Sequence, residues 1–200
     1  MKVFTIPVGL LATNCYLVVV EAKQKLYIID PGAEASEIIN AARSFNFEHV
    51  DILLTHAHVD HISAVAEVAN ALHPDGIFLA SADHELYYSP DNALPPYLMA
   101  AANLPDVANF VPNDDFTLIP LPGHTPGGSG FLFHEFPALF AGDTIFAGSI
   151  GRTDFPGGDY DTIIKSIRNR ILTLPDDLTI YSGHGPATTV GNERLTNPYI

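Results

Sequence analysis

The chain has 200 residues and a mass of 21.6 kDa, about the size of one large domain. Nine Lys and Arg against 23 Asp and Glu give a net charge of −14, which excludes a nucleic-acid binder and disfavours an anionic membrane surface, because both need clustered cations. Hydrophobic residues make up 47% and charged residues 16% of the chain, which excludes a disordered protein.

The first half of the chain predicts three strands followed by alternating helices and strands. The strands at 2–7, 14–20 and 25–30 are rich in β-branched and aromatic residues. Helical spacing of apolar residues predicts helices at 34–45 and 60–72. Short apolar runs at 50–54 and 77–80 predict two buried strands.

The second half resumes this alternation after an irregular segment. Five prolines within residues 89–112 predict an excursion over the surface, which could form a partial lid with Tyr87, Tyr88 and Tyr97. Strands are expected at 116–121, 129–134, 138–141 and 178–181, and a helix at 160–174. With no internal repeat and no linker, we expect a single α/β domain over residues 1–200.

The N-terminal segment, with Lys2 before an apolar stretch, resembles an export signal only faintly. Its apolar stretch is interrupted by Thr5, Pro7 and Gly9, and no small-x-small cleavage pattern follows. The single cysteine, Cys15, excludes an internal disulfide and is expected to be a buried apolar side chain. No apolar run approaches the ~20 residues that span a bilayer. We therefore expect a cytoplasmic protein that binds no membrane.

Nine histidines are unusual in so acidic a chain, and three of them cluster. His56, His58 and His61 lie with Asp60 in one loop, directly after the strand at 50–54. In a compact loop, protonated imidazoles would repel one another, and neutral ones would be buried polar groups in need of partners. A divalent cation resolves both problems, and nitrogen and carboxylate ligands suit zinc, iron or manganese. The alternative is a solvated polar loop.

Three later segments repeat one pattern, in which an apolar strand ends at a glycine-flanked ligand-type residue. These residues are His124, Asp143 and His184. Each would lie at the end of a sheet strand, where sites in α/β proteins are usually built. Together with the first cluster they supply enough ligands for two metal ions with open positions for water. Such a centre would carry a net positive charge and attract an anionic substrate.

These motifs resemble the metallo-β-lactamase superfamily. The run Thr-His-Ala-His-Val-Asp-His at 55–61 is followed in order by Gly-His, Gly-Asp and Gly-His-Gly-Pro. Within the superfamily, Gly-Arg-Thr-Asp-Phe-Pro-Gly-Gly-Asp at 151–159 and Asn-Pro-Tyr at 197–199 are similar to the short, single-domain glyoxalase II-like hydrolases. The resemblance extends from residue 14 to the C-terminus.

The resemblance implies a four-layer αββα sandwich with two divalent metal ions, most typically zinc, with iron or manganese as alternatives. It assigns His56, His58 and His124 to the first metal. It assigns Asp60, His61 and His184 to the second, with Asp143 bridging both. Asp30, in an Asp-Pro-Gly turn, would steady the histidine loop from outside the ligand set.

Three departures limit what the resemblance implies. The most familiar lactamases use a cysteine at the second metal, whereas Cys15 lies far from any ligand motif, which disfavours antibiotic hydrolysis. Glyoxalase II carries a C-terminal helical domain that binds glutathione, and the sequence ends before such a domain could begin. It also has Gly-Pro after its last motif histidine, in place of an acidic residue and a tyrosine.

The resulting hypothesis is a metal-dependent hydrolase that cleaves a small anionic thioester or ester, with an S-2-hydroxyacylglutathione as one substrate type. A metal-bridging hydroxide would attack the acyl carbon, with Asp60 and Asp143 orienting it. One alternative is a mononuclear iron persulfide dioxygenase on the same scaffold, although Pro186 replaces a tyrosine of those enzymes. Another is a non-enzymatic metal-binding protein.

The remaining polar residues divide into a substrate contact and surface positions. Arg152 either binds a substrate carboxylate or forms an internal salt bridge with Asp154 or Asp159. Asp83 and His84, on a short helix, could approach the site, but a solvated helix N-terminus is the favoured expectation. We expect surface or edge positions for three further histidines, His49, His73 and His134.

Overall fold

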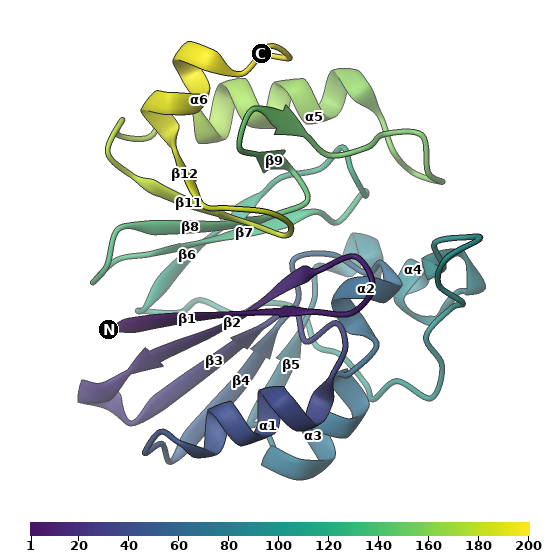
Figure 1. Ribbon diagram of the computed structural model, residues 1–200, viewed down its shortest axis with the longest axis vertical. Helices are drawn as coiled ribbons and strands as arrows, with labels where there is room; N and C mark the ends of the chain where they lie inside the picture. Colours follow the sequence, from purple (N-terminus) through teal and green to yellow (C-terminus); the bar gives the residue numbers. More distant parts are fainter. The chain divides into compact units, whose positions relative to one another are not determined.

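The computed structural model describes residues 1–200. The chain forms two compact units, Met1–Asn109 and Phe110–Ile200, and each combines a five-stranded sheet with helices (Figure 1). No helix is long and apolar enough to cross a membrane.

The sheet of the first unit has the order β1-β2-β3-β4-β5. Its strands are β1 (Lys2–Val8), β2 (Thr13–Val20), β3 (Lys25–Ile29), β4 (His49–Leu53) and β5 (Gly76–Phe78). The first three are antiparallel, whereas β3, β4 and β5 are parallel. The five predicted strands of this half are therefore confirmed, with ends that differ by one or two residues.

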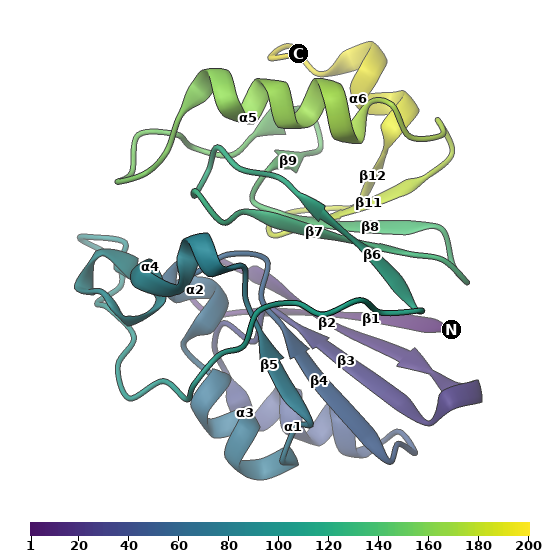
Figure 2. The same ribbon diagram turned by 180° about the vertical axis from the view of Figure 1, so that it is seen from behind.

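Two helices cover one face of this sheet, α1 (Ala35–Arg43) and α3 (Val65–Leu72) (Figure 2). Ile38 of α1 and Val68 of α3 belong to one buried cluster with Ile28 and Ile52 of the strands. The predicted helix at 60–72 is divided into α2 (Val59–Ile62) and α3. The Ala64 amide donates to the carbonyl of Pro31 at 3.0 Å, which interrupts the helix at this residue.

The irregular segment at 89–112 follows helix α4 (His84–Tyr88) and contains the 3₁₀ turn η3 (Pro90–Asn92). Fully buried Asn92 closes it, because its Nδ2 donates to the Tyr87 carbonyl at 3.1 Å and its Oδ1 accepts from the Ala101 amide at 2.9 Å. Tyr87 is buried in the core of this unit, so it is not part of an exposed lid, whereas Tyr88 and Tyr97 are exposed.

The sheet of the second unit has the order β12-β11-β8-β7-β6. Its strands are β6 (Phe116–Pro120), β7 (Ser129–Phe133), β8 (Ala138–Gly142), β11 (Thr179–Ser182) and β12 (Thr188–Thr189). Only β8 and β11 are parallel. A separate two-stranded hairpin, β9 (Ile145–Phe146) with β10 (Ser149–Ile150), was not predicted from the sequence.

Two helical segments cover one face of this second sheet (Figures 1 and 2). Helix α5 (Tyr160–Ser166) continues into the π-helical segment η4 (Ile167–Ile171), and α6 (Val190–Thr196) follows β12. Ile163, Ile167 and Ile171 pack with Leu139 and Ile180 of the strands in one buried cluster. These apolar side chains hold the helices against the sheet. The polar motifs lie at the ends of its strands.

Candidate metal centre

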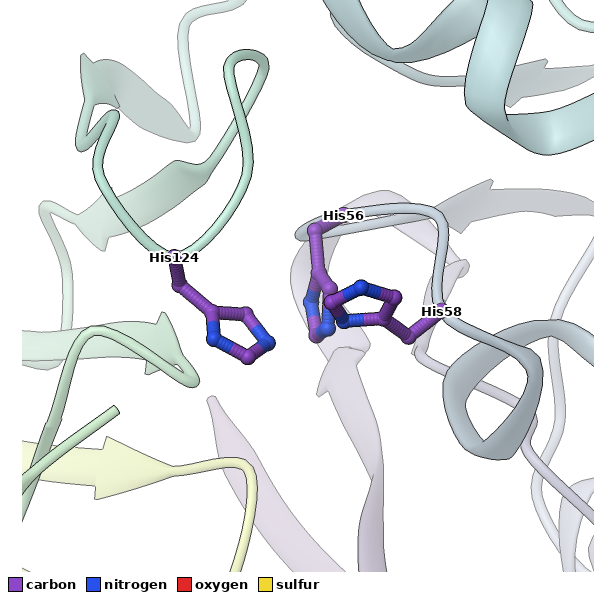
Figure 3. Close-up of side chains that lie close together, drawn as sticks. All are labelled: His56, His58 and His124. Carbon is purple, nitrogen blue, oxygen red and sulfur yellow. The ribbon is translucent and has the colours of Figure 1, made fainter. Parts of the chain in front are cut away.

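The first unit gathers four ligand-type side chains directly after β4. His56 and His58 lie in the loop, and Asp60 and His61 lie in the following helix α2. All four are buried, with at most 7% of each residue exposed. The His56 and His58 rings meet edge to face, with centroids 4.9 Å apart (Figure 3), and the His56 and His61 centroids are 4.1 Å apart.

Asp30, which follows β3, fixes this loop from behind. Its Oδ1 accepts from the Thr55 amide at 2.8 Å, and its Oδ2 accepts from the Thr55 hydroxyl at 2.6 Å and from His61 Nδ1 at 2.9 Å. Because a carboxylate only accepts, Nδ1 of His61 carries the proton and Nε2 carries the lone pair. The structure thus places Asp30 where it can orient His61.

The tautomer of His56 is fixed in the same way. The Thr55 hydroxyl has one proton, and that proton is donated to Asp30. Thr55 Oγ1 therefore accepts from His56 Nδ1, which lies 3.1 Å away. Both imidazoles then carry the lone pair on Nε2, the state that a metal ligand requires.

Asp60 is held on the opposite side of the loop, next to the β1–β2 hairpin. The Thr13 hydroxyl donates to Oδ2 of Asp60 at 2.8 Å, and His61 Nε2 lies 3.5 Å from the same oxygen. A Cβ on Gly32 would overlap the carbonyl oxygen of Asp60. The Asp-Pro-Gly turn after β3 therefore needs glycine here so that the ligand helix can approach closely.

Asp83 is a supporting residue whose approach to the site is the less favoured of two expectations from the sequence. The prediction of a solvated helix N-terminus is wrong for this side chain, which is fully buried. Its Oδ2 accepts from the amide of Ala57 at 3.2 Å, between two of the loop histidines. The available signal was its place just after the strand at 77–80, because α/β sites are built at strand ends.

The second unit gathers the other three predicted ligands around Asp143. His124 lies in the β6–β7 loop and is labelled in Figure 3, Asp143 follows β8, and His184 follows β11. Oδ2 of Asp143 is 3.7 Å from His124 Nε2 and 3.4 Å from His184 Nε2. Asp143 and His184 meet because parallel strands β8 and β11 end at the same edge of the sheet.

His124 is also held through Nδ1. This nitrogen lies 2.7 Å from the carbonyl oxygen of Arg152, and a carbonyl only accepts, so Nε2 again carries the lone pair. A Cβ on Gly151 would overlap the carbonyl oxygen of Asp143. The backbone at 151–152 thus packs directly against two of the three predicted ligands.

The Arg152 side chain makes an internal contact. Its Nε and Nη2 donate to the two carboxylate oxygens of Asp154 at 2.9 and 2.8 Å, and the guanidinium lies 4.1 Å from the ring centroid of Phe155. The Arg152 hydrogen bond lowers the pKa of Asp154 to about 2. Of the two roles open at the sequence level, the structure shows the internal salt bridge.

A cavity of about 210 Å³ lies beside Asp60 within the first unit. Most of its lining is apolar, and it comes from four places: the β1–β2 turn, the Asp-Pro-Gly turn, helix α2 with the residue after it, and the irregular segment. The residues are Val8, Gly9, Leu10, Leu11, Thr13, Gly32, Ala33, Asp60, Ser63 and Leu98. An apolar group of a small ligand would fit next to a carboxylate there.

The donor set fits divalent metal ions. In the first unit, Nε2 of His61 lies 3.5 Å from Oδ2 of Asp60, and in the second unit, Nε2 of His184 lies 3.4 Å from Oδ2 of Asp143. Imidazole nitrogens with the proton fixed on the far side, beside carboxylates, are the ligands that zinc, iron and manganese take in proteins. The hydrogen bonds behind the rings are those of an ordered metal site.

Comparison with known proteins identifies the family. The model of the metallo-β-lactamase superfamily matches residues 8–184. The hydroxyacylglutathione hydrolase GloC of Haemophilus influenzae is 37% identical, over all of this chain and 98% of that protein. Between them, these matches span both units.

Two solved structures share the fold over nearly the full length. TTHA1623, in a di-iron-bound form, is 35% identical with a TM-score of 0.89, covering 98% of this chain and 100% of that one. The B3 metallo-β-lactamase BLEG-1 is 33% identical with a TM-score of 0.88, covering 99% of each chain. The predicted metallo-β-lactamase fold is confirmed, and this chain belongs to the metallo-β-lactamase superfamily of metal-dependent hydrolases.

Proposed function

We propose that this protein is a dinuclear metal hydrolase that cleaves small thioesters or esters. The observation that carries the proposal is the hydrogen bonding of His56, His61 and His124, each held through Nδ1 by an acceptor chain that leaves Nε2 as the ligand atom. Histidines that only stabilise a core do not need hydrogen bonds that fix the proton on Nδ1. Metal ligands do.

The ligand assignment follows the order of the motifs. His56, His58 and His124 hold the first ion, Asp60, His61 and His184 hold the second, and Asp143 bridges them. The di-iron form of TTHA1623, at 35% identity, supports a pair of ions. We infer zinc, with iron or manganese as alternatives, because imidazole and carboxylate ligands suit all three.

The chemistry at the site divides between the ions and the chain's own residues. When bound, such ions lower the pKa of a water molecule to about 7 and polarise a carbonyl group. Asp60 and Asp143 fix where the attacking oxygen lies, and the Thr13 hydroxyl fixes the rotamer of Asp60. The apolar cavity beside Asp60 receives the acyl side of the substrate.

The substrate class follows from the relatives and the charge. GloC is named a hydroxyacylglutathione hydrolase, and we propose a glutathione thioester or a related small anionic thioester for this chain. The Arg152 guanidinium, exposed and paired with Asp154, could exchange that partner for a substrate carboxylate.

Metal analysis combined with an Asp143→Asn variant tests this function. We expect two zinc, iron or manganese ions per chain and hydrolysis of S-D-lactoylglutathione by the wild type. The variant should lose metal and at least about 10³-fold in kcat, because a neutral amide cannot bridge two cations. Full thioesterase activity in a metal-replete variant contradicts the assignment. One iron per chain with oxygen uptake would support a persulfide dioxygenase instead.

β-Lactam hydrolysis is a second candidate activity, because BLEG-1 carries the B3 metallo-β-lactamase name at 33% identity. The absence of a cysteine ligand argues only against the most familiar lactamase subclass. It does not argue against a lactamase of the B3 type. Measuring kcat/KM for S-D-lactoylglutathione and for benzylpenicillin on the same preparation decides between them. We expect the thioester to be the better substrate, and a preference for benzylpenicillin would reverse the assignment.

A further inference from the structure

The C-terminal helix α6 contains a fully buried carboxylate, that of Glu193. Its Oε2 accepts from the Gly148 amide at 2.9 Å and from Asn197 Nδ2 at 2.8 Å. Its Oε1 accepts from the Thr188 hydroxyl at 2.6 Å and from Asn192 Nδ2 at 3.0 Å. A buried charge is retained only where donors compensate its lost hydration, and four donors do so here.

Two of these side chains bind the turn between β9 and β10. Glu193 accepts from the Gly148 amide, and Asn197 Nδ2 donates to the carbonyl of Ser149 at 3.0 Å. The hairpin has two residues in each strand, which is too short to be stable alone. Its conformation therefore depends on outside contacts. The Ser182 hydroxyl donates to the Ile145 carbonyl at 2.6 Å and Ile145 packs in the core, while α6 holds the Gly148–Ser149 end.

The hairpin leads directly to the ligands of the second unit. The Gly151 amide, just after β10, donates to the Thr144 carbonyl at 3.3 Å. Gly151 itself packs against the Asp143 carbonyl so closely that a Cβ would overlap it. The next carbonyl, that of Arg152, accepts from His124 Nδ1 at 2.7 Å.

We propose that Glu193 and Asn197 are positioning residues that orient His124 by fixing the β9–β10 hairpin. Their hydrogen bonds to the hairpin go to Gly148 and Ser149. They therefore act on His124 indirectly, through the backbone at 151–152. This also gives the Asn-Pro-Tyr motif at 197–199 a physical role. The inference uses the proposed function only in treating His124 as a metal ligand.

The Glu193→Gln variant tests the proposal. A glutamine amide keeps the shape but, in either orientation, directs an NH₂ group at two groups that now donate. The Thr188 hydroxyl can turn to accept, whereas the Gly148 amide and the NH₂ groups of Asn192 and Asn197 cannot, so at least one hydrogen bond is lost. We expect faster amide hydrogen exchange at Gly148 and Gly151, with Ile163 of α5 unchanged. We also expect the His124 Nδ1–H NMR signal to broaden and the dissociation constant for zinc to rise about 10- to 100-fold.

The control is Phe116→Ala, a cavity beside the rings of Phe131 and Phe133, which destabilises this unit outside the buried cluster that contains Ile145 of the hairpin. It should lower the melting temperature while leaving the three hairpin readouts at wild-type values. Should Glu193→Gln fold poorly, Asn197→Ala removes the bonds to Ser149 and Glu193 and should produce the same changes more mildly. Unchanged exchange at Gly148 and Gly151, with unchanged zinc affinity, overturns the proposal.

None of these measurements uses catalytic activity, so the two proposals fail separately. If the wild type binds no zinc, iron or manganese, the proposed function is wrong, and hydrogen exchange and the His124 signal still decide whether α6 positions the imidazole. If zinc binds but the thioester is not cleaved, the positioning result stands.

Discussion

Each of three imidazoles in this protein has an acceptor behind its Nδ1, and those acceptors come from different places. For His61 it is the Asp30 carboxylate, for His56 the Thr55 hydroxyl, and for His124 the Arg152 carbonyl. Asp30 acts on two of them, since it also takes the Thr55 proton. The Asp30 carboxylate thus fixes the tautomers of both His56 and His61.

Replacement of Asp30 by asparagine should therefore affect both histidines at once. The amide NH₂ would face either the Thr55 hydroxyl or the Thr55 amide, and the neutral group no longer holds the His61 proton as strongly. We expect about 1–3 kcal/mol lower stability and about 10- to 100-fold weaker zinc binding, measured by urea unfolding and chelator competition. Asp75→Asn, at an exposed ion pair, is the control and should leave zinc binding unchanged.

At the scale of elements, helix α6 is stabilised by the ionised form of Glu193. Burial raises the pKa of this carboxyl, but hydrogen bonds from Thr188, Gly148, Asn197 and Asn192 together lower it below its ordinary value. A lowered pKa in the folded state means that the carboxylate contributes stability above its ordinary pKa. That contribution is lost as the pH falls towards the folded-state value.

The expected consequence is a pH-dependent difference between wild type and Glu193→Gln. At pH 7 the variant should be less stable by about 2 kcal/mol, and the difference should shrink as the pH falls to about 3, measured by urea unfolding. Glu135→Gln, at an exposed position, should show no such convergence. A difference that stays constant with pH would show that the charge of Glu193 is not what stabilises α6.

The elements that sequence could predict are those with long apolar periodicity. Strands such as β4 and helices such as α1 follow from residue patterns alone, and the proposed ligand residues come from motifs at the ends of such strands. The break before α3 could not be predicted, because it depends on a hydrogen bond from Ala64 to distant Pro31. The β9–β10 hairpin has too few residues for a pattern, and the buried carboxylates of Asp83 and Glu193 resemble surface residues in sequence.

At the scale of the whole molecule, a net charge of −14 surrounds a centre that would be cationic when loaded. The repulsion by the overall negative charge and the attraction by the cationic centre differ in range. The long-range repulsion of an anionic substrate is screened by salt, whereas contact with the centre at short range is screened much less. The single domain and the cytoplasmic location stay predictions.

Salt should therefore raise kcat/KM for an anionic thioester. Between 0.01 and 0.15 M ionic strength the Debye length falls from about 30 to about 8 Å, which removes most of the repulsion. A neutral thioester measured in parallel should show no rise. If the anionic substrate is instead slowed by salt, local attraction outweighs the overall charge.

The buried strand β2 contains the only cysteine of the chain, Cys15. Burial, and secondarily the charge of Asp30, raises its pKa well above the ordinary value, so the reactive thiolate is scarce as well as shielded. A thiol reagent can therefore follow the thiol released from a thioester without a background from the enzyme. Without substrate, the same reagent reacts only when β2 opens, so the protein contains its own reporter of unfolding.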